Sequence, residues 1–92
     1  MIKIYKTYPK KRLLAKGTNL KDACLNWEGR RDNNDDLWRA FKESKFYNSE
    51  LDFDEEVEMY DQFIESLTGE EMFDIMRDGI YTKWEVVWKA LN

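Results

Sequence analysis

The sequence of 92 residues has no histidine, one cysteine and one proline, and its four glycines stand apart from one another. The absence of histidine removes the commonest general base and metal ligand, and with it catalytic triads of the Ser-His-Asp and Cys-His types. The isolated glycines form no phosphate-binding loop. We therefore expect a protein that is not an enzyme and that holds no cofactor and no metal.

Cysteine and long apolar runs are equally scarce. Because Cys24 is the only cysteine, no intrachain disulfide can form, which suits a reducing cytoplasm. Cys24 lies on an apolar helical stripe, so we interpret it as a small core residue rather than a reactive thiol. No apolar run approaches the roughly 20 residues that a transmembrane helix needs. These features predict a soluble cytoplasmic protein with no membrane partner.

What the sequence does have is a high aromatic content for one small domain, which we place over residues 1–92. Four Trp, five Tyr and five Phe contribute to a hydrophobic fraction of 42%. Each buried aromatic ring removes roughly 150–250 Å² from water. The chain therefore has enough apolar material for a folded core, although 37% of its residues are charged.

The charge is divided between the two halves of the chain. Residues 1–46 carry twelve Lys or Arg and six Asp or Glu, whereas residues 47–92 carry three and thirteen. The halves therefore have net charges of +6 and −10, which give the overall charge of −4. This separation of charge is the feature of the sequence that bears most directly on function.

Periodicity predicts strands at the N-terminus. Ile2 and Ile4 alternate with polar or amphipathic residues, a period of two that is typical of a half-buried strand. Pro9 ends this strand in a turn, and residues 12–16 can return as a second strand. The N-terminal segment is therefore predicted to be a β-hairpin.

Two helices are expected to follow, with boundaries between residues 19 and 49 that the pattern leaves open. The first begins after an Asn19 N-cap, and its apolar face consists of Leu20, Ala23, Cys24 and Trp27. A break over 29–34 separates it from the second, which Asn34 or Asp35 caps and which carries Leu37, Trp38 and Phe41. One bent helix through both pieces is the alternative. A loop over 44–49 contains Phe46 and Tyr47.

Three capping boxes predict three further helices. Asp52 and Glu55 open the third helix, whose predicted apolar stripe is Phe53, Val57, Tyr60, Ile64 and Leu67. Thr68 and Glu71 open the fourth, which Gly79 ends. Thr82 and Glu85 open a terminal helix carrying Trp84, Val87, Trp88 and Leu91. The predicted fold class is α+β, an N-terminal two-stranded β-hairpin packed against three to five short α-helices.

Acidic residues line one face of the third helix. At about 100° per residue, its carboxylates fall within roughly 60° of arc, in a stripe of Asp54, Glu58, Asp61 and Glu65. The stripe is roughly 16 Å long. Over the same length, one DNA strand carries about five phosphates. The fourth helix repeats the pattern with Glu70, Glu71, Asp74 and Asp78.

Like charges at positions i and i+4 destabilise a helix by roughly 0.2–0.5 kcal/mol per pair. A basic partner surface would compensate for this repulsion, so all eight carboxylates are candidate partner-binding residues. The alternative is a solvated face, with acidic residues favoured near helix N-termini and neutralised by the basic half of the chain. The sequence leaves both interpretations open.

Two other surfaces are candidates for binding. Basic and aromatic residues lie together near the first turn, namely Lys10, Lys11, Arg12, Lys16, Tyr5 and Tyr8. Such residues can bind nucleic acid. They can equally keep the turn soluble and prevent an exposed strand edge from pairing with another chain. Because the net charge is negative, we expect no direct nucleic-acid binding. The alternative function is a small cytoplasmic adaptor that docks through the apolar stripe from Trp84 to Leu91 or through the loop of Phe46 and Tyr47.

The segments MIKIYKTYP…LLAKGTNL and NSELDFDEEVEMYDQFIESLTGEEMFD, with the length of the chain, resemble the small anti-restriction nuclease proteins of T-even phages. The resemblance is diffuse and covers the whole chain. It implies a DNA mimic in the host cytoplasm, whose carboxylates occupy the DNA-binding surface of a restriction endonuclease of the McrBC type. DNA mimics tend to be acidic throughout, so the basic residues 1–46 confine any mimicry here to one face.

The resemblance also implies a dimer. A stripe of roughly 16 Å covers about half a turn of duplex, and two-fold pairing would double this track. We therefore expect a homodimer with its carboxylate stripes on the outer surface, since acidic faces that met would repel each other.

Overall fold

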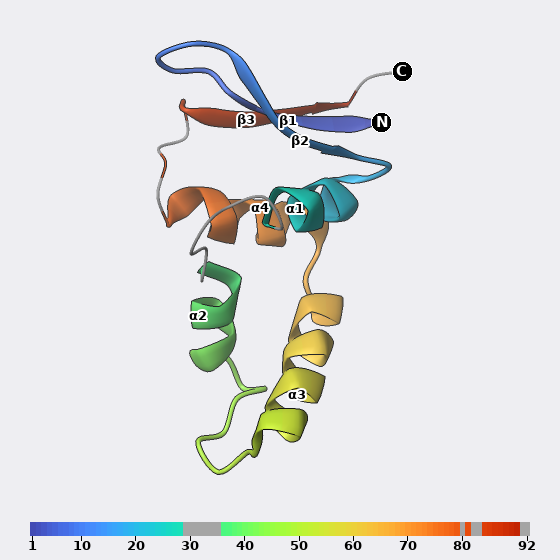
Figure 1. The fold of residues 1–92 in the computed structure, drawn as a ribbon, viewed down its shortest axis with the longest axis vertical. Coiled ribbons are helices and arrows are strands. Elements are labelled where there is room, and N and C mark those ends of the chain that lie inside the picture. The colour runs from blue at the N-terminus through green and yellow to red at the C-terminus, as the bar shows by residue number, and fades with distance from the viewer. Residues whose placement is uncertain (29–35, 80, 82–83, 91–92) are drawn as a thin grey trace.

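The computed structural model describes residues 1–28, 36–79, 81 and 84–90. Its elements are β1 (Ile2–Lys6), β2 (Arg12–Gly17), α1 (Leu20–Glu28), α2 (Asp36–Lys42), α3 (Phe53–Ser66), α4 (Gly69–Asp78) and β3 (Val86–Ala90). The strands form an antiparallel sheet in the order β2-β1-β3. Helices α1 and α4 lie beneath one face of the sheet, and α2 and α3 extend further from it as an arm (Figure 1). The predicted α+β class is confirmed.

The predicted hairpin forms the first two strands. Ile4 of β1 pairs with Ala15 of β2, and both side chains are completely buried. The register shifts between Ile4 and Tyr5, so that Tyr5 pairs with Leu13. Such an irregularity bends the strand and increases its twist. The inward face of the hairpin is therefore apolar, as the period of two predicts.

The predicted terminal helix is wrong, because residues 86–90 form the strand β3. This strand pairs with β1, which places Trp88 opposite Ile4. Two adjacent valines and a tryptophan favour a strand, and the free edge of β1 supplies the backbone partners that complete it. Val87 and Trp88 consequently point to opposite faces of the sheet instead of sharing one helical stripe. Thr82 of the predicted capping box and Leu91 of the predicted stripe lie outside the described residues.

The main core lies between the sheet and the helices α1 and α4. The buried side chains of α1 are those expected, Leu20, Ala23, Cys24 and Trp27. Its predicted N-cap is confirmed, since Oδ1 of Asn19 accepts a hydrogen bond of 2.8 Å from the Asp22 backbone N–H. From α4, Met72, Phe73 and Met76 enter the same core. The predicted break after α1 and the caps Asn34 and Asp35 lie outside the described residues.

A second cluster, made of aromatic rings, joins α2 to α3 in the arm. Phe41 of α2 is completely buried, and its ring contacts those of Trp38, Tyr47, Tyr60 and Phe63 at centroid distances of 5.3–5.9 Å. This cluster corrects the predicted stripe of α3. Phe63 is only 6% exposed, whereas Phe53 is 75% and Val57 39% exposed. The buried face therefore begins at Tyr60, one to two turns later than predicted.

None of the helices in the described ranges is long and apolar enough to cross a bilayer.

Candidate protein-binding surface

A capping box starts α3, the helix that carries the first acidic stripe. The Glu55 backbone N–H donates to Oδ1 of Asp52 at 2.9 Å, and the Asp52 N–H donates to Oε1 of Glu55 at 3.4 Å. The hydrogen bond from the Glu55 backbone, followed by that from its side chain, lowers the pKa of Asp52. This side chain is therefore charged at neutral pH, where it stabilises the positive end of the helix dipole.

The aromatic cluster of the arm then fixes the rotation of α3. The ring of Tyr60 lies 4.8 Å from that of Trp38 and 5.6 Å from that of Phe41. Burial, reinforced by the nearby charge of Glu28, raises the pKa of Tyr60, which therefore stays neutral. Phe63 packs on Phe41 and Phe46 from the next turn. With Tyr60 and Phe63 turned toward α2, the opposite face of α3 must point to solvent.

That opposite face is the predicted acidic stripe. All four of its members are exposed, and they are Asp54, Glu58, Asp61 and Glu65. Within the described part of the chain, no ion pair or hydrogen bond reaches their carboxylates. Lys21 does approach this helix, but its Nζ donates to the backbone carbonyls of Glu65 and Leu67, at 3.2 and 2.8 Å. It therefore caps the end of α3 and lies beyond ion-pair distance of the carboxylates of the stripe.

The second acidic set is also exposed, but most of its carboxylates are already engaged. Arg77, whose side chain is only 13% exposed, forms ion pairs with Asp74 at 3.0 Å and Asp78 at 2.8 Å. Glu71 accepts from the Thr68 backbone N–H at 3.0 Å, and this hydrogen bond lowers its pKa. Because α4 lies across the direction of α3 (Figure 1), the second set does not extend the first in a straight line.

Two exposed apolar residues flank the acidic stripe. Phe53 and Val57 lie at the N-terminal end of α3, next to the stripe on the helix surface. Sequence reasoning assigned them to the core. The spacing of Tyr60, Phe63, Ile64 and Leu67, at i, i+3, i+4 and i+7, was the signal for the stripe that is at least partly buried. The N-terminal half of α3 thus offers an apolar contact beside its carboxylates.

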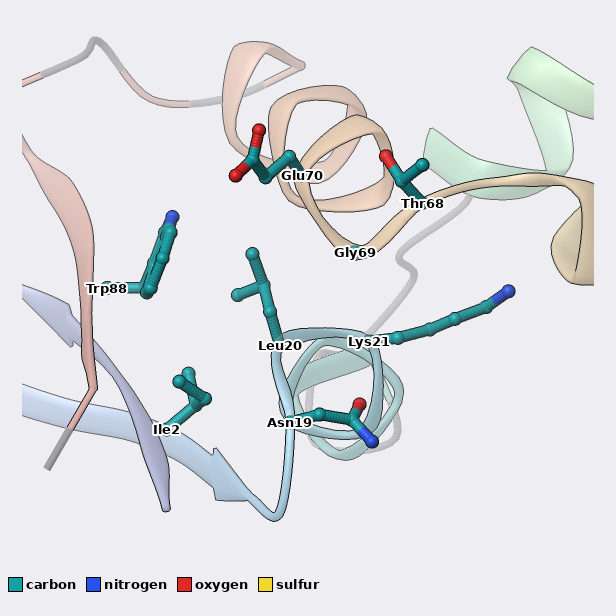
Figure 2. A pocket seen from close by; sticks show the side chains of 8 residues that line it. All are labelled: Ile2, Asn19, Leu20, Lys21, Thr68, Gly69, Glu70 and Trp88. Carbon is teal, nitrogen blue, oxygen red and sulfur yellow. The ribbon is translucent and has the colours of Figure 1, made fainter. Parts of the chain in front are cut away.

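The residues predicted to form an adaptor surface do not lie together in one exposed patch. Phe46 packs on Phe63 and Tyr47 on Phe41, so both belong to the arm cluster. Trp84 is 79% exposed in the turn before β3. Trp88 instead points to the helical side of the sheet, where it lines a groove (Figure 2).

This groove has a volume of about 690 Å³ and lies between the sheet and the first turns of α1 and α4. Its walls include Ile2, Leu20 and Trp88, and Glu70 stands on its α4 side (Figure 2). Lys21 extends away from the opening (Figure 2), toward the backbone carbonyls that it binds. In the described ranges, no three Asp, Glu or Cys side chains are grouped so that they could hold a metal ion.

The single thiol does not take part in any of these surfaces. Cys24 is completely buried in the main core. Burial, with a smaller effect of the Glu28 charge, raises the pKa of Cys24 to about 12. At neutral pH the thiolate, which is the reactive form, is therefore almost absent.

We expect the Cys24 thiol of the folded protein to resist alkylation at pH 8, because both access and ionisation are suppressed. Mass spectrometry after iodoacetamide treatment should find the native protein unmodified over minutes and the protein in guanidinium chloride fully modified. Rapid stoichiometric labelling of the native protein would contradict the burial of this side chain.

No protein-family model, curated protein or solved structure matches this chain.

Proposed function

We propose that this protein is a non-catalytic inhibitor that mimics DNA and presents α3 to the DNA-binding surface of a host protein. The single observation that carries the proposal is the stripe of Asp54, Glu58, Asp61 and Glu65, exposed along one face of a helix, whose carboxylates form no ion pair within the described residues. A solvated helix ordinarily mixes the two signs of charge. Four adjacent carboxylates are therefore better suited to a basic groove.

The arm supports this proposal because it makes the stripe rigid before binding. Ordering a flexible surface on association costs affinity, and a surface fixed by packing avoids that cost. The rings of Phe41, Tyr60 and Phe63 hold α3 in one orientation. The N-terminal end of α3 also lies at the end of the molecule opposite the sheet (Figure 1), and the stripe faces away from α2. The basic strands consequently do not cover the stripe.

The resemblance to the anti-restriction nuclease proteins of T-even phages supplies the proposed target, a restriction endonuclease of the McrBC type in the host cytoplasm. In this proposal the α4 carboxylates have a secondary role, because Arg77 and Thr68 already engage three of them. A homodimer with both stripes facing outward would supply a longer acidic track, as expected above.

The test is binding of the protein to a purified McrBC-type endonuclease, with duplex DNA as competitor. We expect binding to weaken steeply with salt and to be displaced by duplex DNA. Changing Asp54→Asn, Glu58→Gln, Asp61→Asn and Glu65→Gln together should weaken it about a hundredfold or more, because one close charge pair across an interface can contribute about 2–5 kcal/mol. Biolayer interferometry at several salt concentrations would measure the effect.

The matched control carries the same change of four charges on α4, through Glu70→Gln, Glu71→Gln, Asp74→Asn and Asp78→Asn. A smaller loss is expected there, since these groups are partly neutralised within the chain. Equal losses from the two variants would mean that net charge, and not the α3 stripe, governs binding. Salt-independent binding that tolerates both variants would overturn the proposal.

A second candidate function, an adaptor that docks through apolar contacts, is favoured by the exposure of Phe53 and Val57. In that case charge would affect mainly the rate of association, while the aromatic ring of Phe53, which the partner would bury, would set the affinity. The double variant Phe53→Ala, Val57→Ala would then leave the association rate unchanged and raise the dissociation rate at least tenfold. The acidic variant of α3 would show the reverse.

A further inference from the structure

The face of the sheet that points away from the helices is uncovered by any described element (Figure 1). Ile4, Ala15 and Val86 point into the main core, so the residues that alternate with them point outward. Within this outer face, Lys3 of β1 pairs with Lys16 of β2 on one side and with Lys89 of β3 on the other. Three lysines therefore form one row across the whole sheet.

This lysine row is electrostatically unfavourable for the protein alone. Like charges directly opposite one another on neighbouring strands destabilise a sheet. The strands contain no acidic residue but five basic ones, namely Lys3, Lys6, Arg12, Lys16 and Lys89. No carboxylate of the described residues lies within ion-pair distance of the row. An anion with regularly spaced charges would relieve the repulsion.

Exposed aromatic rings lie at one end of the same sheet. Thr7 follows β1 and donates its backbone N–H to the carbonyl of Glu85 at 2.7 Å and its hydroxyl to the carbonyl of Trp84. These hydrogen bonds bring the segment of Tyr8 next to that of Trp84. Tyr8 is 66% and Trp84 79% exposed. Two large aromatic side chains in neighbouring segments are thus exposed to solvent.

The turn between β1 and β2 adds charge at this aromatic end. Lys10, Lys11 and Arg12 are all exposed there. The Nζ of Lys11 lies 4.9 Å from the centre of the Tyr5 ring, which also belongs to the outer face. Binding of a single strand requires basic groups along the path of its sugar-phosphate backbone and aromatic rings on which its bases stack.

We propose that the outer face of the sheet binds single-stranded nucleic acid, with phosphates along the row of Lys3, Lys16 and Lys89 and bases stacked on Trp84 and Tyr8. A single strand is favoured over a duplex because only unstacked bases expose their faces to aromatic side chains. It is favoured over an acidic protein surface because such a surface would match the lysines but would leave the exposed rings unused. The site stands independently of the acidic stripe.

The negative net charge of the chain argued against nucleic-acid binding only as an average over all residues. The structure places the lysine row on the outer face of the sheet, whereas the acidic stripe lies on the arm and the acidic residues of α4 lie on the helical side of the sheet (Figure 1). At physiological ionic strength the Debye length is about 8 Å, and α3 extends from the helical layer away from the outer face of the sheet (Figure 1). The acidic stripe therefore has little influence on an anion at the sheet.

The experiment is a fluorescence anisotropy titration of the full chain into labelled oligothymidylate and oligouridylate of about 12 nucleotides. Replacing Lys16→Gln and Lys89→Gln together should lower the slope of log K against log salt concentration by about 1.4, because each single-strand phosphate contact contributes about 0.7. Trp84→Ala should weaken binding about tenfold, as expected for the loss of one stacked base. The two oligonucleotides separate a preference for DNA from one for RNA.

The matched control is Lys42→Gln with Lys45→Gln, which removes the same two charges from exposed positions on and just after α2. It should leave both the affinity and the salt slope unchanged, and circular dichroism should confirm that every variant is folded. Poly-glutamate serves as an acidic-peptide probe. Equal binding of poly-glutamate, insensitive to Trp84→Ala, would replace the proposal with docking of an acidic protein. Absence of binding at 50 mM salt would overturn it, and the lysines would then serve only to mask the strand edges.

Discussion

Replacing Phe41 with alanine is expected to lower the free energy of unfolding by about 3–5 kcal/mol, the usual cost of removing a fully buried phenylalanine side chain. The expectation follows from the position of this ring at the centre of the arm. It is completely buried and contacts the rings of Trp38, Tyr47, Tyr60 and Phe63. A domain of this size is stable by only about 5–15 kcal/mol in total, so the variant should unfold at a much lower urea concentration.

Phe53→Ala provides the matched control, because it removes the same side chain from the same arm at a position that is 75% exposed. Surface substitutions of this kind usually change stability by less than about 0.5 kcal/mol. Urea titrations followed by circular dichroism would measure both variants. Similar losses in the two would mean that the arm cluster is not packed around Phe41. If the Phe41→Ala variant keeps its main core folded but no longer binds the endonuclease, the orientation of α3 is required for binding.

Replacing Gly17 with alanine is expected to cost about 3 kcal/mol, at the upper end of the range for overpacking. A Cβ atom at this position would lie 2.4 Å from the backbone N of Ala23 and 2.8 Å from the backbone C of Asp22. Both atoms belong to α1, which packs against β2 at this point. Since they are backbone atoms, the clash can be relieved only by moving the helix away from the sheet.

The effect of this glycine is steric rather than conformational, because none of the glycines in the described residues has a positive φ. Lys16→Ala, one residue earlier on the same strand and exposed, should change stability by less than about 0.5 kcal/mol. Thermal and urea unfolding would measure the difference. A Gly17→Ala protein as stable as the parent would show that β2 and α1 are not in such close contact.

The candidate binding surface was predicted in part. The stripe of Asp54, Glu58, Asp61 and Glu65 follows from the helical period alone, because residues spaced by three and four positions share a face wherever the helix lies. Its flanking residues did not follow, since Phe53 and Phe63 are both apolar and only packing against α2 decides which of them is buried. The pairing of Arg77 with Asp74 and Asp78 likewise depended on side-chain geometry.

The sequence by itself determined the features that depend on neighbouring residues. Asn19, Asp52 and Thr68 cap their helices through hydrogen bonds to backbone groups only three positions away. The alternation of β1 and the turn that follows it are equally local. In each case the interacting groups are close in the chain, so that little conformational entropy opposes their contact.

Only the tertiary structure decided the state of residues 86–90 and the surface to which they contribute. Their apolar spacing fits a helix, yet pairing with β1 brings Trp88 opposite Ile4 and Lys89 opposite Lys3 from the two ends of the chain. Neither the strand nor the row of three lysines exists without that pairing. Short apolar segments satisfy either structure locally, and the unpaired backbone groups of a distant strand edge determine which one forms.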